Sequence, residues 1–223
     1  MTSDTDTTLY LASGSPRRHE ILNQLLIPHQ VLHVPPQEGD DEPQFHGEPA
    51  DQYVRRTARD KVTHAVKWLA KKNTSAETNM LNKPSTPAAP DTLPNDVIIL
   101  CADTVVILDG TVLGKPLDYE DAARTLSRLS GRTHQVHTAV AVQRADALFE
   151  SVSVSHVHFK ALTMAEINTY CNIGDGMGKA GAYGIQGPAA AFVMRLSGSY
   201  TGVMGLPAYE TVDLLKAARY VHR

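Results

Sequence analysis

Residues 9–18, Leu-Tyr-Leu-Ala-Ser-Gly-Ser-Pro-Arg-Arg, begin as a short apolar strand and pass through a turn of small residues into a helix. Pro16 suits the first helical position, where its missing N–H costs nothing, and Ser15 is placed to cap the helix. A strand, a turn and a helix start together form an anion site, because free N–H groups and the positive end of the helix dipole point to one spot. The stretch therefore predicts an anion-binding turn close to the N-terminus.

Two arginines follow in the first turn of this predicted helix. Arg17 and Arg18 lie where the helix dipole disfavours cations, which favours an anion bound between their guanidinium groups. The alternative is an ordinary strand-to-helix connection with solvated arginines. The stretch taken alone supports both readings equally.

The composition is that of an ordinary globular protein. The 223 residues are enough for one sizeable core, as one domain or two lobes, with 42% hydrophobic and 20% charged residues. A net charge of -3 argues against a dedicated nucleic-acid binder. Cys101 and Cys171 form no CxxC pair, so we expect neither a disulfide framework nor a zinc cluster. We therefore expect the protein to reside in a reducing compartment.

The N-terminal residues 1–8 are polar and rich in Thr and Asp, and we predict a disordered tail. They lack the apolar core of a signal peptide, and we find no run of residues suited to span a membrane. We therefore expect a cytoplasmic protein with no membrane partner.

The next elements are a strand at 30–34, an acidic loop at 35–42 and a helix from Pro49 to about residue 72. Within the loop, Glu38 lies closest to the strand end and is the carboxylate best placed to face a cleft. The helix carries one apolar stripe on which Lys61 also falls. A lysine there either snorkels to the rim, which the pattern slightly favours, or reaches a buried anion. Residues 73–95 change to Thr, Ser, Pro, Ala and Asn, which predicts a flexible surface insertion.

A continuous apolar run at 97–102 predicts a central strand that ends at Asp103 and Thr104. A hairpin of 105–108 and 111–113 is expected next, turned by Asp109 and Gly110. Open α/β sheets bind ligands at the carboxyl ends of their strands, so Asp103 is a candidate site residue. The alternative is a carboxylate that only caps the strand end.

The remaining chain predicts helices at 118–129, 163–172 and 209–220, and strands at 133–143, 149–159, 190–196 and 200–204. The histidines of the two long strands lack a third ligand at suitable spacing and are interpreted as surface residues. The glycines at 174–181 follow a helix, so we reject a dinucleotide site there and expect a flexible loop.

Six motifs occur in order: Leu11–Arg18 (LASGSPRR), Ala102–Val106 (ADTVV), Leu113–Pro116 (LGKP), Leu129–Gly131 (LSG), Gly181–Gly187 (GAYGIQG) and Gly205–Pro207 (GLP). With them the chain resembles the Maf family of nucleoside triphosphate pyrophosphatases over residues 9–216. Six ordered motifs are far more specific than any one alone. The resemblance is interrupted mainly at 73–95, which looks longer than the family norm.

This resemblance implies an α/β fold related to inosine triphosphate pyrophosphatases, with a mixed sheet, flanking helices and two lobes around a deep cleft. It implies a single domain over 9–223, a homodimer, and hydrolysis of a nucleoside triphosphate to its monophosphate and pyrophosphate with a divalent cation, Mg²⁺ or Mn²⁺. Asp103 matches the family's proposed general base. The other site residues that it implies are Ser13, Arg17 and Arg18 for the substrate, the lysines Lys61 and Lys115, and, where the match is weakest, Glu38.

These residue types suit the implied chemistry. A triphosphate brings about four negative charges, which the arginines, the lysines and a cation would neutralise before a nucleophile approaches. We therefore expect Lys61 to reach into the cleft. Asp103 would orient or deprotonate the attacking water, and Glu38 and Asp103 together would hold the cation. Whether Asp103 is the base, a metal ligand or both stays open.

Within the family, a Thr after the Asp and a Gln in the Ile-Gln-Gly motif resemble the branch that acts on dTTP and UTP, here Thr104 and Gln186. The glutamine amide both donates and accepts, as recognition of a pyrimidine edge requires. Modified pyrimidine nucleotides are further candidate substrates, whose hydrolysis would limit incorporation of non-standard nucleotides. The alternatives are a Maf enzyme specific for 7-methyl-GTP or another modified nucleotide, and a nucleotide-binding regulator of cell division.

Overall fold

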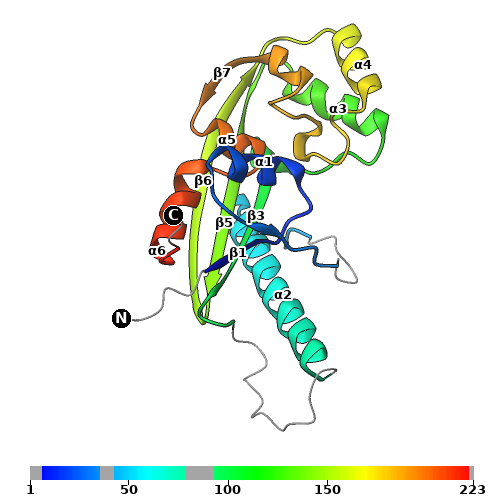
Figure 1. Cartoon of the computed structure of the whole chain (residues 1–223). Coiled ribbons are helices and arrows are strands. Elements are labelled where there is room, and N and C mark those ends of the chain that lie inside the picture. Colours follow the sequence, from blue (N-terminus) through cyan, green and yellow to red (C-terminus); the bar gives the residue numbers. More distant parts are fainter. Residues whose placement is uncertain (1–6, 36–42, 79–92, 221–223) are drawn as a thin grey trace.

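The computed structural model describes residues 7–35, 43–78 and 93–220, and within them seven strands form one mixed sheet. The strand order is β2-β1-β3-β5-β6-β7, with β4 paired to β3 off this path. Helices flank the sheet (Figure 1), which confirms the predicted α/β class. The division into two lobes stays a prediction. Among the described residues, no helix is both long and apolar enough to cross a membrane.

The centre of the sheet is built from three long strands, β3 (Val97–Leu108), β5 (Thr133–Arg144) and β6 (Ala147–Phe159). Both neighbouring pairs are antiparallel. The prediction that the strand after residue 97 ends at Asp103 is wrong, because β3 continues through Asp103 and Thr104 without a break. Its partner β5 pairs with it from Ile98 to Ile107, and this long ladder keeps the two polar residues in extended backbone.

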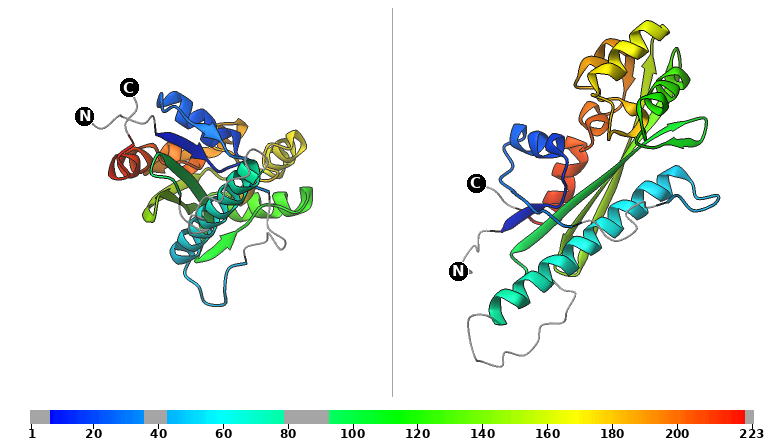
Figure 2. Two further views of the ribbon diagram at one scale, coloured as in Figure 1. Left: turned by 60° about the horizontal axis from the view of Figure 1, so that its bottom comes forward. Right: turned by 90° about the vertical axis from the view of Figure 1, so that its right-hand side faces the viewer.

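Successive side chains of β3 point to opposite faces of the sheet. The even-numbered apolar residues, such as Ile98 and Leu100, join the larger core cluster, whereas the odd-numbered Ile99 and Cys101 join the core beneath helix α2 (Ala50–Thr78). Figure 2 shows α2 on one side of the sheet and α1 (Pro16–Gln24) and α6 (Ala208–Ala217) on the other. The alternation therefore directs neighbouring residues of β3 toward different helices.

One edge of β3 is paired in two separate places. β1 (Thr8–Leu11) runs parallel to Val97–Leu100, and β4 (Thr111–Leu113) runs antiparallel to Val106–Leu108. Among the described residues, no strand pairs with 101–105 on this edge. The gap leaves the middle of a central strand open from the side, and Asp103 and Thr104 lie within it.

Helix α2 packs on the sheet through the predicted apolar stripe, whose members are all buried: Val54, Ala58, Val62, Ala65 and Leu69. The helix continues to Thr78, into the stretch expected to be an insertion, and Leu93 near the end of that stretch is buried. The part of the predicted insertion that is left, 79–92, lies outside the described residues, as do Glu38 and residues 1–6 of the predicted tail.

Of the other predicted elements, the strand at 30–34 is much shorter than expected, the strand at 190–196 begins three residues later, and the strand at 200–204 does not form. The strand β2 is only Gln30–Val31, and β7 spans Val193–Ser197. The helices α3 and α4 span Tyr119–Leu129 and Met164–Ile173, and short 3₁₀ turns lie at Ala180–Ala182 and Pro188–Phe192.

The strand predicted at 200–204 is wrong, because Tyr200–Met204 is a short helix, α5. The Ser199 hydroxyl caps it by accepting from the Gly202 N–H, and Gly205 ends it at a φ of 118°. The carboxyl end of this helix contacts α1.

Two histidines of β5 contradict the surface interpretation. His134 is 1% exposed and His137 is 8% exposed, whereas His156 on β6 is exposed. Nε2 of His134 lies 2.8 Å from the Tyr183 hydroxyl, and the ring packs edge-on against Phe159. Burial, with a smaller effect of His158, lowers the pKa of His134 from 6.5 to about 4. The neutral ring is therefore part of the folded core.

We predict that the free energy of unfolding falls by about 2 kcal/mol between pH 7 and pH 5 because of His134. The unfolded chain takes up a proton near pH 6.5 and the folded protein only near pH 4, so this contribution is complete above pH 6.5 and is lost as the pH falls. Urea unfolding at both pH values measures the loss. His134→Gln, which does not titrate, should show a loss smaller by that amount, and equal losses in both proteins would contradict the prediction.

Candidate active site

A cavity of about 600 Å³ opens at the unpaired edge of β3. Its described lining includes five Lys or Arg residues and two Asp residues, so cations dominate. Every predicted site residue that the structure describes lies in this lining; they are Ser13, Arg17, Arg18, Lys61, Asp103, Thr104, Lys115 and Gln186. Such an excess of positive charge in a concave site favours a polyanionic ligand.

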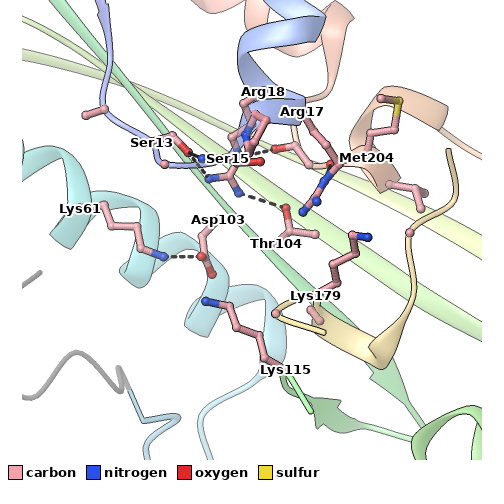
Figure 3. Close-up of a pocket in the computed structure, with 18 of the residues that line it drawn as sticks. Ser13, Ser15, Arg17, Arg18, Lys61, Asp103, Thr104, Lys115, Lys179 and Met204 are labelled. Carbon is pink, nitrogen blue, oxygen red and sulfur yellow. Dashed lines mark hydrogen bonds and ion pairs between the residues drawn. The ribbon is translucent and has the colours of Figure 1, made fainter. Parts of the chain in front are cut away.

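Asp103 is held by two residues of α2. It is an odd-numbered residue of β3, so its carboxylate points to the face covered by that helix. The Thr57 hydroxyl lies 2.8 Å from Oδ2, and the Lys61 ammonium pairs with Oδ1 (Figure 3). Thr57 and Lys61 are four residues apart and therefore lie on one helix face. Both contacts come from donors, as an ionised carboxylate requires, and Lys61 reaches inward to this anion.

Thr104 points to the opposite face, where it meets Arg18. The guanidinium donates to Ser13 Oγ at 3.0 Å and to Thr104 Oγ1 at 3.5 Å. Thr104 Oγ1 lies 3.0 Å from Thr138 Oγ1, which itself donates to the Gly202 carbonyl at 2.8 Å. Because the Thr138 proton is used there, Thr104 donates to Thr138 and accepts from Arg18. Thr104 thus fixes the direction of the guanidinium.

The two arginines at the start of α1 contact the carboxyl end of α5. Arg18 Nε donates to the Gly205 carbonyl at 2.8 Å, and Arg17 Nε donates to the Met204 carbonyl at 3.3 Å. The negative end of one short helix therefore offsets the unfavourable position of the cations at the start of another. Burial lowers the pKa of Arg18, although Asp103 opposes this, and a guanidinium stays protonated. Each terminal nitrogen of Arg18 donates one N–H within the protein and keeps its second N–H for a ligand in the cavity.

The start of α1 also faces the cavity, through residues 14–17. Ser15 occupies the predicted N-cap position, but its hydroxyl makes no capping hydrogen bond. Instead, Ser13 Oγ accepts from the Ser15 N–H at 3.2 Å as well as from Arg18. Both contacts use the oxygen of Ser13 as an acceptor, which leaves its proton for an anionic ligand.

The far wall of the cavity comes from the segment after β4 and from the loop around η1 (Ala180–Ala182). Lys115 is exposed and points into the cavity, and Gln186 is exposed at its lining. A hydrogen bond of 3.1 Å from the Gly181 N–H to the Gly114 carbonyl joins the two segments. Gly181 itself has a φ of 69° and packs on Val106, where a Cβ would lie 2.9 Å from the valine side chain.

Two residues of the site, Thr57 and Lys179, were not predicted from the sequence. Thr57 stands one helical turn before Lys61, so the helical spacing was the signal that pointed to it. Lys179 also lines the cavity, but it lies in the glycine-rich loop expected to be merely flexible. Its ammonium is 2.6 Å from Oδ1 of Asp175, which lies four residues earlier in the chain. The conformation of the loop brings these two side chains together.

The described residues suit a divalent cation bound together with a substrate. Among them no group of three or more His, Cys, Asp or Glu side chains is arranged to hold a metal alone. Mg²⁺ is usually held by one or two carboxylates and by substrate phosphates, and not by a cage of protein ligands. The Asp103 carboxylate, inside a cavity that favours a polyanion, fits that kind of site.

The whole arrangement places one carboxylate opposite a set of cations. Cations of this kind can hold a phosphate ester or anhydride, and a carboxylate in the same cavity can serve as a proton acceptor. These groups together suit the hydrolysis of a polyphosphate.

Comparison with known proteins gives a consistent result. A family model described as Maf-like protein matches residues 8–218. A protein of Bordetella pertussis named dTTP/UTP pyrophosphatase is 52% identical over 210 residues, which cover 94% of this chain and 92% of that protein. Proteins of the same name from Cupriavidus pinatubonensis and Methylococcus capsulatus are 43% and 42% identical, over 95% of this chain and 96% and 91% of theirs.

Proposed function

The chain belongs to the family of Maf-like proteins, and we propose that it is a hydrolase that converts dTTP and UTP to their monophosphates and pyrophosphate. One observation carries the proposal: Asp103 lies in a cavity with Arg17, Arg18, Lys61, Lys115 and Lys179, at the unpaired edge of a central strand. The relatives named dTTP/UTP pyrophosphatase, similar over nearly the whole chain, support the choice of substrates.

In the proposed reaction a water attacks the α phosphorus, and the bond from that phosphorus to the bridging oxygen breaks. The water proton passes to the Asp103 carboxylate, which Thr57 and Lys61 hold in one orientation. Pyrophosphate leaves with the electron pair of the broken bond. Arg17, Arg18 and Lys115 stabilise the charge that collects on it.

A divalent cation, Mg²⁺ or Mn²⁺, is part of this proposal. When bound it would neutralise phosphate charge that the protein cations leave. Asp103 and, from outside the described residues, Glu38 would hold it. The Thr57 hydroxyl keeps the Asp103 carboxylate in place for either task, as base or as ligand.

Two residues are proposed to set the base preference. Gln186, exposed at the cavity, presents an amide that can donate to O4 of a pyrimidine and accept from N3–H. Thr104 acts through Arg18, since its hydroxyl is already engaged on both sides by Arg18 and Thr138. A cytoplasmic location and a homodimer stay predictions.

A panel of nucleoside triphosphates tests the proposal, with pyrophosphate release as the readout. We expect turnover of dTTP and UTP above all others, and a fall below about a tenth of the rate in excess EDTA that added Mg²⁺ or Mn²⁺ reverses. Turnover confined to 7-methyl-GTP would contradict the substrate assignment. Binding of nucleotides without release of pyrophosphate would instead favour the regulator. An unchanged rate in EDTA would contradict the role of the cation.

A further inference from the structure

The side chain of Gln186 is aimed by a tight turn. The Gly187 N–H donates to the Gly184 carbonyl at 3.0 Å, which closes a turn with Ile185 and Gln186 at its centre. Ile185 is 4% exposed and joins the core, whereas Gln186 is exposed at the cavity. A small rotation of this turn would therefore redirect the amide.

A polar cluster lies directly beneath this turn. Asp175 accepts from the Lys179 ammonium at 2.6 Å and from the Tyr170 hydroxyl at 2.7 Å, one on each carboxylate oxygen. The same tyrosine oxygen accepts from the Gly184 N–H at 3.3 Å. Hydrogen bonds thus connect the carboxylate to the first residue of the turn. Burial raises the pKa of Asp175, but the bonds from Lys179 and Tyr170 outweigh it, so its pKa lies below the ordinary value.

The backbone of the turn rests on these side chains. A Cβ at Gly184 would lie 3.1 Å from Cε of Lys179, and a Cβ at Gly187 would lie 3.0 Å from Oδ2 of Asp175. Neither glycine has a φ in the left-handed range, so close approach and not backbone conformation explains them. Gly184 and Gly187 therefore allow the backbone of the turn to pack closely against the ion pair of Asp175 and Lys179.

We propose that Tyr170, Asp175 and Lys179 are positioning residues that lock the turn 184–187, so that the Gln186 amide reads the pyrimidine in one orientation. The inference rests on the proposed function. A mostly buried ion pair adds little net stability but fixes geometry, and Lys179 and Asp175 are only 14% and 23% exposed. Because the glutamine amide must place its donor at O4 and its acceptor at N3–H, a turn that shifts would move both atoms away from thymine and weaken the preference over cytosine.

The test measures kcat and KM for dTTP and dCTP in wild type, Tyr170→Phe, Gln186→Ala and the double variant. Tyr170→Phe removes only the hydroxyl and keeps the ring, which packs edge-on against Phe192 at 5.3 Å between centroids. We expect the ratio of kcat/KM for dTTP to that for dCTP to fall about tenfold, with kcat for dTTP changed less than about threefold. The double variant should lose no more selectivity than Gln186→Ala alone.

Two further proteins complete the experiment. Asp175→Asn keeps the shape of the side chain and should lower the ratio in the same direction. Tyr119→Phe, which removes a hydroxyl that donates to the Asn168 carbonyl at 3.3 Å on the protein surface, should leave the ratio unchanged. Thermal unfolding of each variant shows that it is folded.

Each remaining outcome is decisive. Ratios within about twofold of wild type in both Tyr170→Phe and Asp175→Asn would overturn the inference and leave the proposed function intact. Losses that add in the double variant would overturn it too, because the cluster would then act elsewhere than through Gln186. A wild type without preference for dTTP would contradict the proposed function, and the inference with it.

Discussion

Replacing Asp103 with asparagine is expected to lower kcat/KM for dTTP by about 10³-fold while the protein stays folded. The amide has the shape of the carboxylate and still accepts from Thr57 or Lys61, so the packing between β3 and α2 is kept. It cannot take a proton from water, and it is a poorer ligand for a cation. The loss should fall on kcat, as measured by pyrophosphate release at saturating dTTP.

Asp60→Asn is the matched control for this variant. Asp60 lines the same cavity, but its carboxylate is 57% exposed and pairs with Arg56 at 3.6 Å, one turn earlier on α2. We expect its activity to stay within about threefold of wild type. Turnover of dTTP by Asp103→Asn at the parental rate would show that the mechanism proposed here is wrong.

Arg18→Lys is expected to lower kcat/KM for dTTP by about 10²-fold although the charge is retained. The guanidinium donates to Gly205, Ser13 and Thr104 at the same time, one bond from each nitrogen, and the second N–H of each terminal nitrogen remains for a phosphate. An ammonium cannot reach these three acceptors and a phosphate together, because its donors radiate from a single nitrogen. Steady-state kinetics with dTTP measures the loss, and we expect a rise in KM as well as a fall in kcat.

The control for this change is Arg124→Lys. Arg124 lies on the surface of α3 and pairs with Asp121 at 3.0 Å, and neither residue belongs to the described cavity lining. It should keep wild-type kinetics. If Arg18→Lys did the same, the three hydrogen bonds to Arg18 would serve only the fold and the arginine would have no part in holding the substrate.

Both variants depend on the unpaired edge of β3. Central strands normally have neighbours along their whole length, and here β1 covers one part of the edge and β4 another. The side chains between them are held by a rigid ladder with β5 on the other edge, yet a ligand can reach them. Rigid support with open access is what a positioned catalytic group requires.

Local patterns predicted much of the fold. Alternation and turn residues predicted β5 and β6, capping sequences predicted α3 and α4, and the apolar stripe predicted the buried face of α2. The prediction of a strand at 200–204 was wrong because the Ser199 cap and Gly205 favour a short helix over the β propensity of the residues between them. The surface interpretation of His134 and His137 was wrong because the two residues lie on opposite faces of β5 and both faces are covered, which the alternation of a strand does not show.

The candidate site was predicted as a set of residues, not as a geometry. The resemblance named Asp103, Arg18 and Lys61, and the structure brings them into one cavity. Their contacts could not be read from the chain: Thr57 meets Asp103 across 46 residues, and Arg18 meets Gly205 across 187. Glu38 lies outside the described residues, so its place in the site stays a prediction.

The sequence by itself determined the elements, the family resemblance and the list of charged residues, because these depend on short-range periodicity and on motifs. Only the tertiary structure decided that Asp103 lies inside β3 and that Asp103 and Thr104 serve opposite faces. It also decided that Lys179 lies against Asp175 under the turn of Gln186. The physical reason is that strand pairing and helix docking join residues far apart in the chain, and no local pattern records which edge of a strand stays open.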